Sequence, residues 1–375
     1  MKEIKFGVSI SLSGRYSVQG VESFEGLTLW VKDVNQSGGI LIKKDGKKLP
    51  VKLIYYDDES SSDKCQILVE KLIVEDKVDV LIGPYSSGLT LSAAPIADKY
   101  KKILWNHGGS SDEIFKKGFR YIVSTISPAS KYLNGIIDMV RTIDKEAKKI
   151  AIFQAKDSGF SVSVAKGAGG YGKEKGVQVT NFKYQSGTKD FSSLLKQLKE
   201  DKPDIILSGG RAEDEVILAK QIIEHRVSAK AIGLIVAGIK HFKEQLGKDA
   251  ECFLGPSQWE RMIKIKPDFG ATPEEFFKRF KDAYGKEPDY TAAQGYNIGL
   301  VIQKGIEESG TLEDISIRET IKKMEFKTFY GDFKIDPITG NQRGHRMLIV
   351  QWQGDNKFIV YPKEVAERHP IYPKT

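Results

Sequence analysis

Short apolar runs alternate with helical patterns of apolar residues along most of the chain. Residues 4–12 predict a strand, and apolar residues then recur at helical spacing from residue 21 to the helix-ending sequence SGG at 37–39. Further strands are predicted at 51–56, from 78 onward and at 103–105, with helices at 65–73 and 89–100. Strands that alternate with helices are typical of a parallel sheet covered by helices on both faces.

The same rhythm begins again after residue 128. Strands are predicted at 149–154, 177–184, 204–208 and 230–236, and helices at 161–175, 191–200 and 212–226. A chain of 375 residues exceeds the usual size of one hydrophobic core. We therefore predict an α/β protein with two doubly wound parallel-sheet lobes. The remaining helices (273–284, 292–308) and strands (331–335, 347–353, 357–361) form a tail that is long enough to cross between the lobes more than once.

The composition of the chain argues against several classes of protein. Hydrophobic residues make up 40% and charged residues 29% of the chain, as in ordinary soluble proteins, and no apolar run approaches the roughly 20 residues of a membrane helix. The formal charge is +8, but Lys and Arg are scattered among nearly as many Asp and Glu, so no nucleic-acid partner is expected. The N-terminus, MKEIKFGV, has no hydrophobic signal region, which leaves open a cytosolic protein or one whose leader has been removed.

The loops after the predicted strands are rich in hydroxyl groups, glycines and aromatic residues. In open parallel sheets, ligands bind beyond the carboxyl ends of the strands. Loops 13–20, 84–88 and 106–111 would share this edge in the first lobe, and loops 157–161, 209–212 and 234–238 would share it in the second. Backbone amides and hydroxyls there could hold a small polar group, while aromatic side chains enclose the rest of the ligand.

The segment VDVLIGPYSSG at 78–88 shows this chemistry most clearly. An apolar strand passes directly to a helix N-terminus, where free N–H groups and the positive end of the dipole favour an anion, and Ser86 and Ser87 add hydroxyl donors. The alternative is that Ser87 only caps the helix.

Sequence motifs for catalysis and cofactors are absent or misplaced. The sequence GAGGYGK at 167–173 matches a dinucleotide pattern and nearly matches a P-loop, but it does not directly follow a strand, and Glu174 replaces the required Ser or Thr. No metal spacing or nucleophile motif occurs, and the lone His107 is expected to be structural. Cys65 and Cys252 predict two buried thiols, with a disulfide left open. We expect no enzyme, no cofactor and no metal.

The chain resembles the type I periplasmic solute-binding proteins of ABC importers, specifically the branched-chain amino acid (Leu/Ile/Val) group. The resemblance covers nearly the whole chain. It rests on the order and spacing of SLSGRYSVQG, NQSGGI, YYDDES, KVDVLIGPYSSG, AAPIADKYKK and YGDFKIDPITGNQRG. It implies the periplasmic binding protein-like I fold, with three crossover segments joining a lobe of residues 1–124 plus 258–335 to a lobe of residues 125–257 plus 336–375.

The resemblance also implies a function. The protein would be a monomeric, extracytoplasmic receptor, periplasmic or lipid-anchored, that binds a small carboxylate in the interlobe cleft and delivers it to the membrane subunits of an ABC transporter. The alternative is a ligand-sensing domain of a regulator or receptor, similar to amide sensors.

Site residues follow from the same resemblance. Ser87, Gly108 and Ser110 would hold the ligand carboxylate, Tyr16 would supply an aromatic ring, and Phe160 would close over the ligand. The full expected set of ligand-binding residues is Tyr16, Gln19, Tyr85, Ser86, Ser87, Asn106, Gly108, Gly109, Ser110, Phe160, Arg211 and Ile235.

Two departures from the family pattern bear on the ligand. Amino acid binders of this group carry an acidic residue near 234–236, where this chain has Leu-Ile-Val, and a buried ammonium without a counter-charge is costly. Arg211 stands where the family often has tyrosine, and a guanidinium favours a carboxylate. These departures favour an aromatic or branched aliphatic acid without an amine. The alternative is that Glu213 or Asp214 supplies the missing charge for an amino acid.

Overall fold

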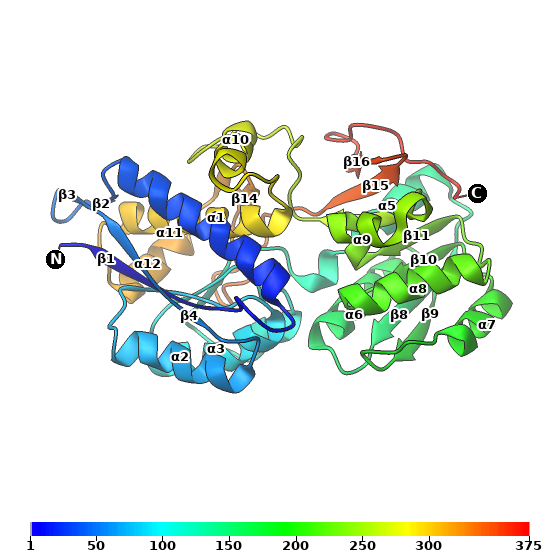
Figure 1. The fold of residues 1–375 in the computed structure, drawn as a ribbon, viewed down its shortest axis with the longest axis horizontal. Helices are drawn as coiled ribbons and strands as arrows, with labels where there is room; N and C mark the ends of the chain where they lie inside the picture. Colours follow the sequence, from blue (N-terminus) through cyan, green and yellow to red (C-terminus); the bar gives the residue numbers. More distant parts are fainter. Residues whose placement is uncertain (1, 375) are drawn as a thin grey trace. The chain divides into compact units, whose positions relative to one another are not determined.

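The computed structural model describes residues 2–374 and shows an α/β protein whose chain forms two compact units (Figure 1). The first unit contains Met1–Ser127 and Ile263–Arg346, and the second contains Pro128–Met262 and Met347–Thr375. The chain therefore passes from one unit to the other three times. Within residues 2–374, no helix is both long and apolar enough to cross a membrane.

The first unit is built on a five-stranded parallel sheet with the order β4-β1-β5-β6-β7. Ile4 of β1 pairs with Val51 of β4, while Phe6 pairs with Val80 of β5. The strand order reverses between β1 and β5, and such a reversal marks where ligands bind in open α/β sheets. The strands are β1 (Ile4–Ile10), β4 (Val51–Asp57), β5 (Val80–Ile82), β6 (Leu104–Asn106) and β7 (Ile122–Ser124).

Helices cover both faces of this sheet. One face packs against α2 (Ser62–Val74), α3 (Ser87–Lys99) and α4 (Asp112–Lys116) through a cluster of buried apolar side chains that includes Cys65, Leu81 and Leu104. On the other face lie α1 (Ser17–Gln36) and α11 (Tyr290–Ser309), which pack closely together.

The second unit repeats this topology. Its sheet has the order β16-β15-β12-β11-β10-β8-β9. The order of its parallel strands again reverses, here between β8 and β10. Strands β15 and β16 join antiparallel, which the prediction of a purely parallel sheet did not include. The strands are β8 (Lys149–Ala155), β9 (Gln178–Tyr184), β10 (Ile205–Ser208), β11 (Ala231–Leu234), β12 (Leu254–Ser257), β15 (Leu348–Gln353) and β16 (Asn356–Tyr361).

Alternate side chains of these strands point to two separate apolar layers. Ile206 and Phe153 pack against α7 (Ser192–Asp201), α8 (Ala212–Glu224) and α9 (Lys240–Leu246). Ile205 and Leu207 pack on the opposite side against α5 (Asn134–Ile143) and α6 (Gly159–Glu174). In Figure 1, α8 lies over the sheet of this unit. The predicted doubly wound α/β fold is confirmed.

Some predicted boundaries are wrong. The hairpin of β2 (Ile40–Ile42) and β3 (Lys47–Leu49) was not predicted, and the strand expected at 331–335 is the short β14 (Gly331–Phe333), which pairs with β13 (Phe326–Thr328) outside the main sheet. The third crossing follows Arg346, not residue 335. The physical reason is that residues 336–346 pack in the first unit, where His345 Nδ1 lies 2.7 Å from Ser127 Oγ.

Two further helices complete the first unit. These helices are α10 (Pro273–Tyr284) and α12 (Asp314–Ile321).

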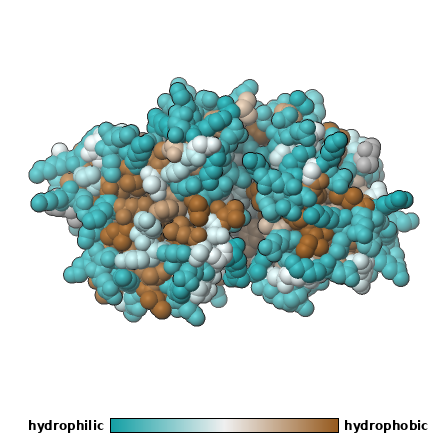
Figure 2. All heavy atoms as spheres, viewed as in Figure 1, coloured by the Kyte–Doolittle hydropathy of each residue, from teal (hydrophilic) through white to brown (hydrophobic). Residues whose placement is uncertain are grey.

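The face of the protein seen in Figure 2 is mainly hydrophilic, with hydrophobic residues in patches. Among the exposed apolar side chains are Val18, Ile67, Ile315 and Ile338.

Glycine permits the close contact between α1 and α11, and this contact can be tested. A Cβ on Gly295 would lie 1.9 Å from the carbonyl oxygen of Ser23, so Gly295→Ala must push the helices apart. We expect this overpacking to lower the free energy of unfolding by about 1–3 kcal/mol, measured by urea denaturation. Gly170→Ala is the control, because a Cβ there meets nothing within 4 Å, and it should leave stability unchanged or slightly raised. Equal effects of the two substitutions would contradict this account of the helix contact.

Candidate functional site

The loop after β1 and the start of α1 form one side of the reversal point in the first unit. The helix begins at Ser17 rather than at the predicted residue 21, so Tyr16 is its N-cap and Gln19 lies in its first turn. Gly20 lies in the first part of this helix, and glycine is needed there because a Cβ would lie 2.0 Å from the carbonyl oxygen of Ser11. Tyr16 and Gln19 are both partly buried, and the guanidinium of Arg15 lies 4.7 Å from the centroid of the Tyr16 ring.

The loop after β5 separates the roles of its two serines. Ser86, not Ser87, caps α3, because its hydroxyl accepts from the N–H of Leu89 at 3.3 Å. Ser86 also has a φ of 98°, a conformation that residues other than glycine rarely adopt and that is common at functional sites. Ser87 Oγ instead accepts from the backbone N–H groups of Ser110 and Ser111, at 3.1 and 3.0 Å. These bonds occupy both lone pairs of the hydroxyl, so its hydrogen remains to be donated.

The loop after β6 packs directly against the loop after β5. A Cβ on Gly108 would lie 2.6 Å from Cα of the partly buried Tyr85, and a Cβ on Gly109 would lie 2.4 Å from Thr90 Oγ1. Only glycines allow this approach, which also brings the buried Ser110 beside Ser87. The structure therefore places the predicted residues 85–87 and 108–110 together at one edge of the sheet.

Asn106 holds this loop in place. Its Oδ1 accepts from the N–H of Gly109 at 2.8 Å, and its Nδ2 donates to the carbonyl of Gly109 at 2.7 Å and to Ser124 Oγ at 3.2 Å. The side chain is fully buried. These contacts make Asn106 a positioning residue for Gly108 to Ser110, and a direct contact between Asn106 and a ligand stays a prediction.

Two buried ionisable side chains stabilise the same edge. His107 Nδ1 lies 3.0 Å from Ser23 Oγ, and burial lowers the pKa of His107 to about 4, so the ring is neutral at pH 7. Asp58 accepts hydrogen bonds from the hydroxyls of Ser9 and Ser11, at 3.1 and 2.6 Å, and burial raises its pKa. Both side chains are bound within the unit, as expected for His107.

Part of the corresponding edge of the second unit is aromatic and apolar. Phe160 is in the first turn of α6, and its ring makes an edge contact with Tyr132 at a centroid distance of 5.6 Å. The Tyr132 hydroxyl accepts from Gln258 Nε2 at 2.6 Å, which fixes the aromatic pair. Ile235 begins the 3₁₀ turn Ile235–Gly238 after β11 and is partly buried. Tyr132 and Gln258 were not predicted from the sequence, because both lie in irregular segments without a periodic pattern.

Arg211 lies among acidic side chains at this edge. It precedes α8 and is partly buried. Burial raises the pKa of Asp214, and the nearby charge of Arg211 acts in the opposite direction. Arg211 likewise helps to lower the pKa of Asp157, where hydrogen bonds from Ser186 outweigh the effect of burial. The guanidinium therefore has negative charges of the protein close to it.

A buried acid that was not predicted lies behind Arg211 and Ile235. Glu213 is exposed, and Asp214 accepts from the N–H of Gly187 at 2.9 Å. Glu215 contacts the segment near 235, because its Oε2 accepts from the N–H of Val236 at 2.9 Å. A signal for this role is present in the sequence, since Glu215 continues the buried stripe of Leu218, Ala219 and Ile222 at positions i, i+3, i+4 and i+7. A carboxylate in such a stripe is buried with its helix.

Other candidate chemistry has structural explanations. Residues 167–172 lie inside α6, where a Cβ on Gly167 would be 2.1 Å from the carbonyl oxygen of Ser130, so this glycine serves close packing. Cys65 and Cys252 are both free; Cys65 is buried, whereas Cys252 is partly exposed, contrary to the prediction of two buried thiols. Residues 2–374 contain no group of three or more His, Cys, Asp or Glu side chains that could hold a metal ion.

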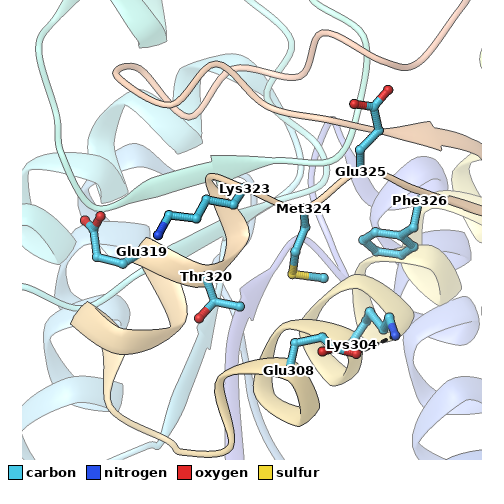
Figure 3. A pocket seen from close by; sticks show the side chains of 8 residues that line it. All are labelled: Lys304, Glu308, Glu319, Thr320, Lys323, Met324, Glu325 and Phe326. Atoms are coloured by element: carbon cyan, nitrogen blue, oxygen red, sulfur yellow. Dashed lines mark hydrogen bonds and ion pairs between the residues drawn. The ribbon is translucent and has the colours of Figure 1, made fainter.

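A groove of about 500 Å³ in the first unit is lined by none of the predicted ligand-binding residues (Figure 3). Its lining comes from α11, α12 and the start of β13, and Lys304 Nζ is 2.7 Å from Glu308 Oε1. Paired charges of this kind offer little net charge to a ligand. The lining residues are Lys304, Glu308, Glu319, Thr320, Lys323, Met324, Glu325 and Phe326.

Comparison with known proteins agrees with this architecture. A family model described as "Periplasmic binding protein" matches residues 3–357. The Leu/Ile/Val-binding protein homolog 7 of Brucella suis is 25% identical over 379 residues, which cover 97% of this chain and 92% of that protein.

Solved structures with the same fold include proteins with two kinds of ligand. The branched-chain amino acid transporter substrate binding protein LivJ from Streptococcus pneumoniae, in complex with isoleucine, has a TM-score of 0.79 at 20% identity and covers 99% of this chain and 100% of its own. A solute binding protein of an ABC transporter from Rhodopseudomonas palustris, in complex with 3,4-dihydroxybenzoic acid, has a TM-score of 0.78 at 21% identity, covering 99% of each chain. At these identities, the two structures establish the shared fold alone.

The buried state of His107 predicts its titration. Because burial lowers its pKa, the folded protein resists protonation of this ring, and the associated stability is present above pH 6.5 and is lost as the pH falls through about 4. Histidine NMR signals recorded between pH 8 and about pH 3 should show His107 with a midpoint near 4. A midpoint near 6.5 for His107 would contradict its placement against Ser23.

Proposed function

Because this chain belongs to the periplasmic binding protein family, we propose that it is the solute-binding receptor of an ABC transporter and that its ligand is a small carboxylate. One observation carries the choice of ligand class. The hydroxyl of Ser87, at the reversal point of the first sheet, accepts from two backbone N–H groups and keeps its hydrogen for a further acceptor.

The surroundings of Ser87 support an anionic partner. The N-termini of α1 and α3 both lie at the carboxyl edge of the first sheet, and neither helix has an acidic residue in its first turn. The positive ends of two helix dipoles therefore act near the Ser87 hydroxyl without a local negative charge on either first turn. A carboxylate would accept from the hydroxyl of Ser87, the backbone N–H of Gly108 and the hydroxyl of Ser110, with Tyr16, Gln19 and Tyr85 beside it.

The second unit supports an apolar or aromatic body for the ligand. Phe160 and Ile235 would contact it, and Arg211 would favour an acid over a cation. Glu215, which bonds the backbone next to both residues, accepts from two N–H groups and is fully buried, so it does not offer its charge to an ammonium. The proposed ligand is therefore an aromatic or branched aliphatic acid without an amine.

The proposed partners follow from the family. A receptor of this kind delivers its ligand to membrane subunits of an ABC transporter, and we propose an extracytoplasmic location and a monomeric state for it. No catalytic step is part of this function.

A set of matched ligands tests the proposal. Isoleucine, its desamino analogue 3-methylpentanoate and 3,4-dihydroxybenzoate would be titrated calorimetrically into the purified protein. We expect an acid without an amine to bind, and 3-methylpentanoate to bind at least about tenfold more tightly than isoleucine, because a desolvated ammonium would lack a counter-charge. Tighter binding of isoleucine would overturn the ligand class, and failure of a broad set of amino acids and organic acids to bind would overturn the receptor function.

Substitution of Ser87 tests the carboxylate contact. Ser87→Ala removes one desolvated donor to the ligand, and we expect the free energy of binding to weaken by about 1–3 kcal/mol for the acid that binds best. Ser92→Ala is the control on the same helix, since its hydroxyl donates to the carbonyl of Gly88 within that helix, at 3.2 Å. Unchanged affinity of Ser87→Ala, together with a loss of stability, would show that Ser87 serves the loop alone.

A further inference from the structure

We propose that Glu215 is a positioning residue that holds the two loops carrying Arg211 and Ile235 in their binding geometry, and that ligand affinity is higher when Glu215 is ionised. This inference rests on the proposed function for its link to ligand affinity. The geometry that carries it belongs to the second unit alone.

A single carboxylate joins two loops that follow different strands. Glu215 Oε1 accepts from the N–H of Gly210, in the loop after β10, at 2.6 Å, and Oε2 accepts from the N–H of Val236, in the turn after β11, at 2.9 Å. Each of these backbone groups is adjacent in sequence to a predicted ligand-binding residue, Arg211 or Ile235. The separation of the two loops therefore depends on one side chain that is completely buried.

The two partners make this clamp sensitive to protonation. Both are backbone N–H groups, which can only donate, and a carboxylate presents a charged, accepting oxygen to each of them. A protonated Glu215 carries one O–H, which must turn toward another acceptor, and its hydroxyl oxygen is a weaker acceptor than a carboxylate oxygen, so one of the two N–H bonds weakens. Burial raises the pKa of Glu215 to about 7, so this change falls within the pH range where the protein can be studied.

The groups around Glu215 define which charges take part. Tyr184 of β9 and Ser208 of β10 present hydroxyls close to the carboxylate, and a Cβ on Gly210 would lie 2.2 Å from the Tyr184 hydroxyl. Asp214, on the same helix, acts to raise the pKa of Glu215, and Arg211 and Asp157 act on Asp214. The oxygens of these hydroxyls are the neutral groups that can accept a hydrogen bond from the O–H of an uncharged Glu215.

The titration has a definite sign. The folded-state pKa is raised from the ordinary 4.5 to about 7, so the stability linked to protonated Glu215 is fully present below pH 4.5 and is lost as the pH rises through about 7. Ligand affinity changes in the opposite direction, because the ionised form orders both loops. At neutral pH, ionisation of Glu215 therefore orders the two loops and lowers the folding stability.

The first test uses the wild-type protein without any substitution. In ¹⁵N NMR spectra recorded from pH 5 to pH 8.5 without ligand, we expect the amide signals of Gly210 and Val236 to titrate together, with the same midpoint as the side-chain carboxyl signal of Glu215. Amides that do not follow the Glu215 carboxyl would overturn the clamp. This outcome does not depend on a ligand, so it separates failure of the clamp from failure of the proposed function.

The second test links the clamp to binding of 3,4-dihydroxybenzoate and 3-methylpentanoate. Wild-type affinity should fall about tenfold between pH 8.5 and pH 5, the effect of losing about one charge-assisted hydrogen bond, and Glu215→Gln should be weak and independent of pH. Glu224→Gln, an exposed position at the other end of α8, is the matched control and should keep the wild-type profile.

Each remaining outcome decides one of the two proposals. A Glu215→Gln protein with wild-type affinity and pH profile would overturn the clamp. If Glu215→Gln does not fold, the coupled titration of the two wild-type amides decides the matter. If neither probe nor any other acid binds while the two amides titrate together, the clamp is supported and the proposed function is not.

Discussion

The termination of the parallel strands is the constraint on which both candidate ligand edges depend. Where a parallel ladder stops, the next backbone N–H groups lose their partners, and burying them unpaired costs free energy. In the first unit, Ser87 Oγ and Asn106 Oδ1 accept from such groups in the loop at 108–111. In the second unit, the carboxylate of Glu215 does so. The side chains that satisfy the strand ends are therefore the ones that shape the loops.

Close backbone contact is the second requirement of this arrangement. A Cβ on Gly108 would clash with Tyr85, so only glycine there lets the loop after β6 come close enough to bond to Ser87. The start of α1 approaches Ser11 for the same reason, through Gly20. Glycine at these positions lets two backbone segments pack in direct contact next to a helix N-terminus.

The strand and helix rhythm could be predicted from sequence because it is local. Apolar runs and helical spacing identified most elements of both sheets and the doubly wound class. Pairing between distant segments left no such local signal. For this reason the strands β15 and β16 were predicted but their antiparallel pairing was not, and the placement of residues 336–346 in the first unit was missed. The candidate loops were predicted correctly as neighbours of strand ends, but the distinct roles of Ser86, Ser87 and Asn106 depend on hydrogen bonds that the sequence does not display.

Each unit contains a buried carboxylate at its candidate ligand edge, and the two carboxylates differ in the groups that donate hydrogen bonds to them. Asp58 of the first unit accepts mainly from the hydroxyls of Ser9 and Ser11, with one backbone N–H from Ser60. Hydroxyls can rotate to accept as well as donate, so a protonated Asp58 can keep most of its contacts. Glu215 accepts from backbone N–H groups of two loops, which have no such freedom. Burial raises the pKa of both carboxyl groups. Protonation changes the hydrogen bonds of the loops mainly at Glu215 in the second unit, because its backbone partners can only donate.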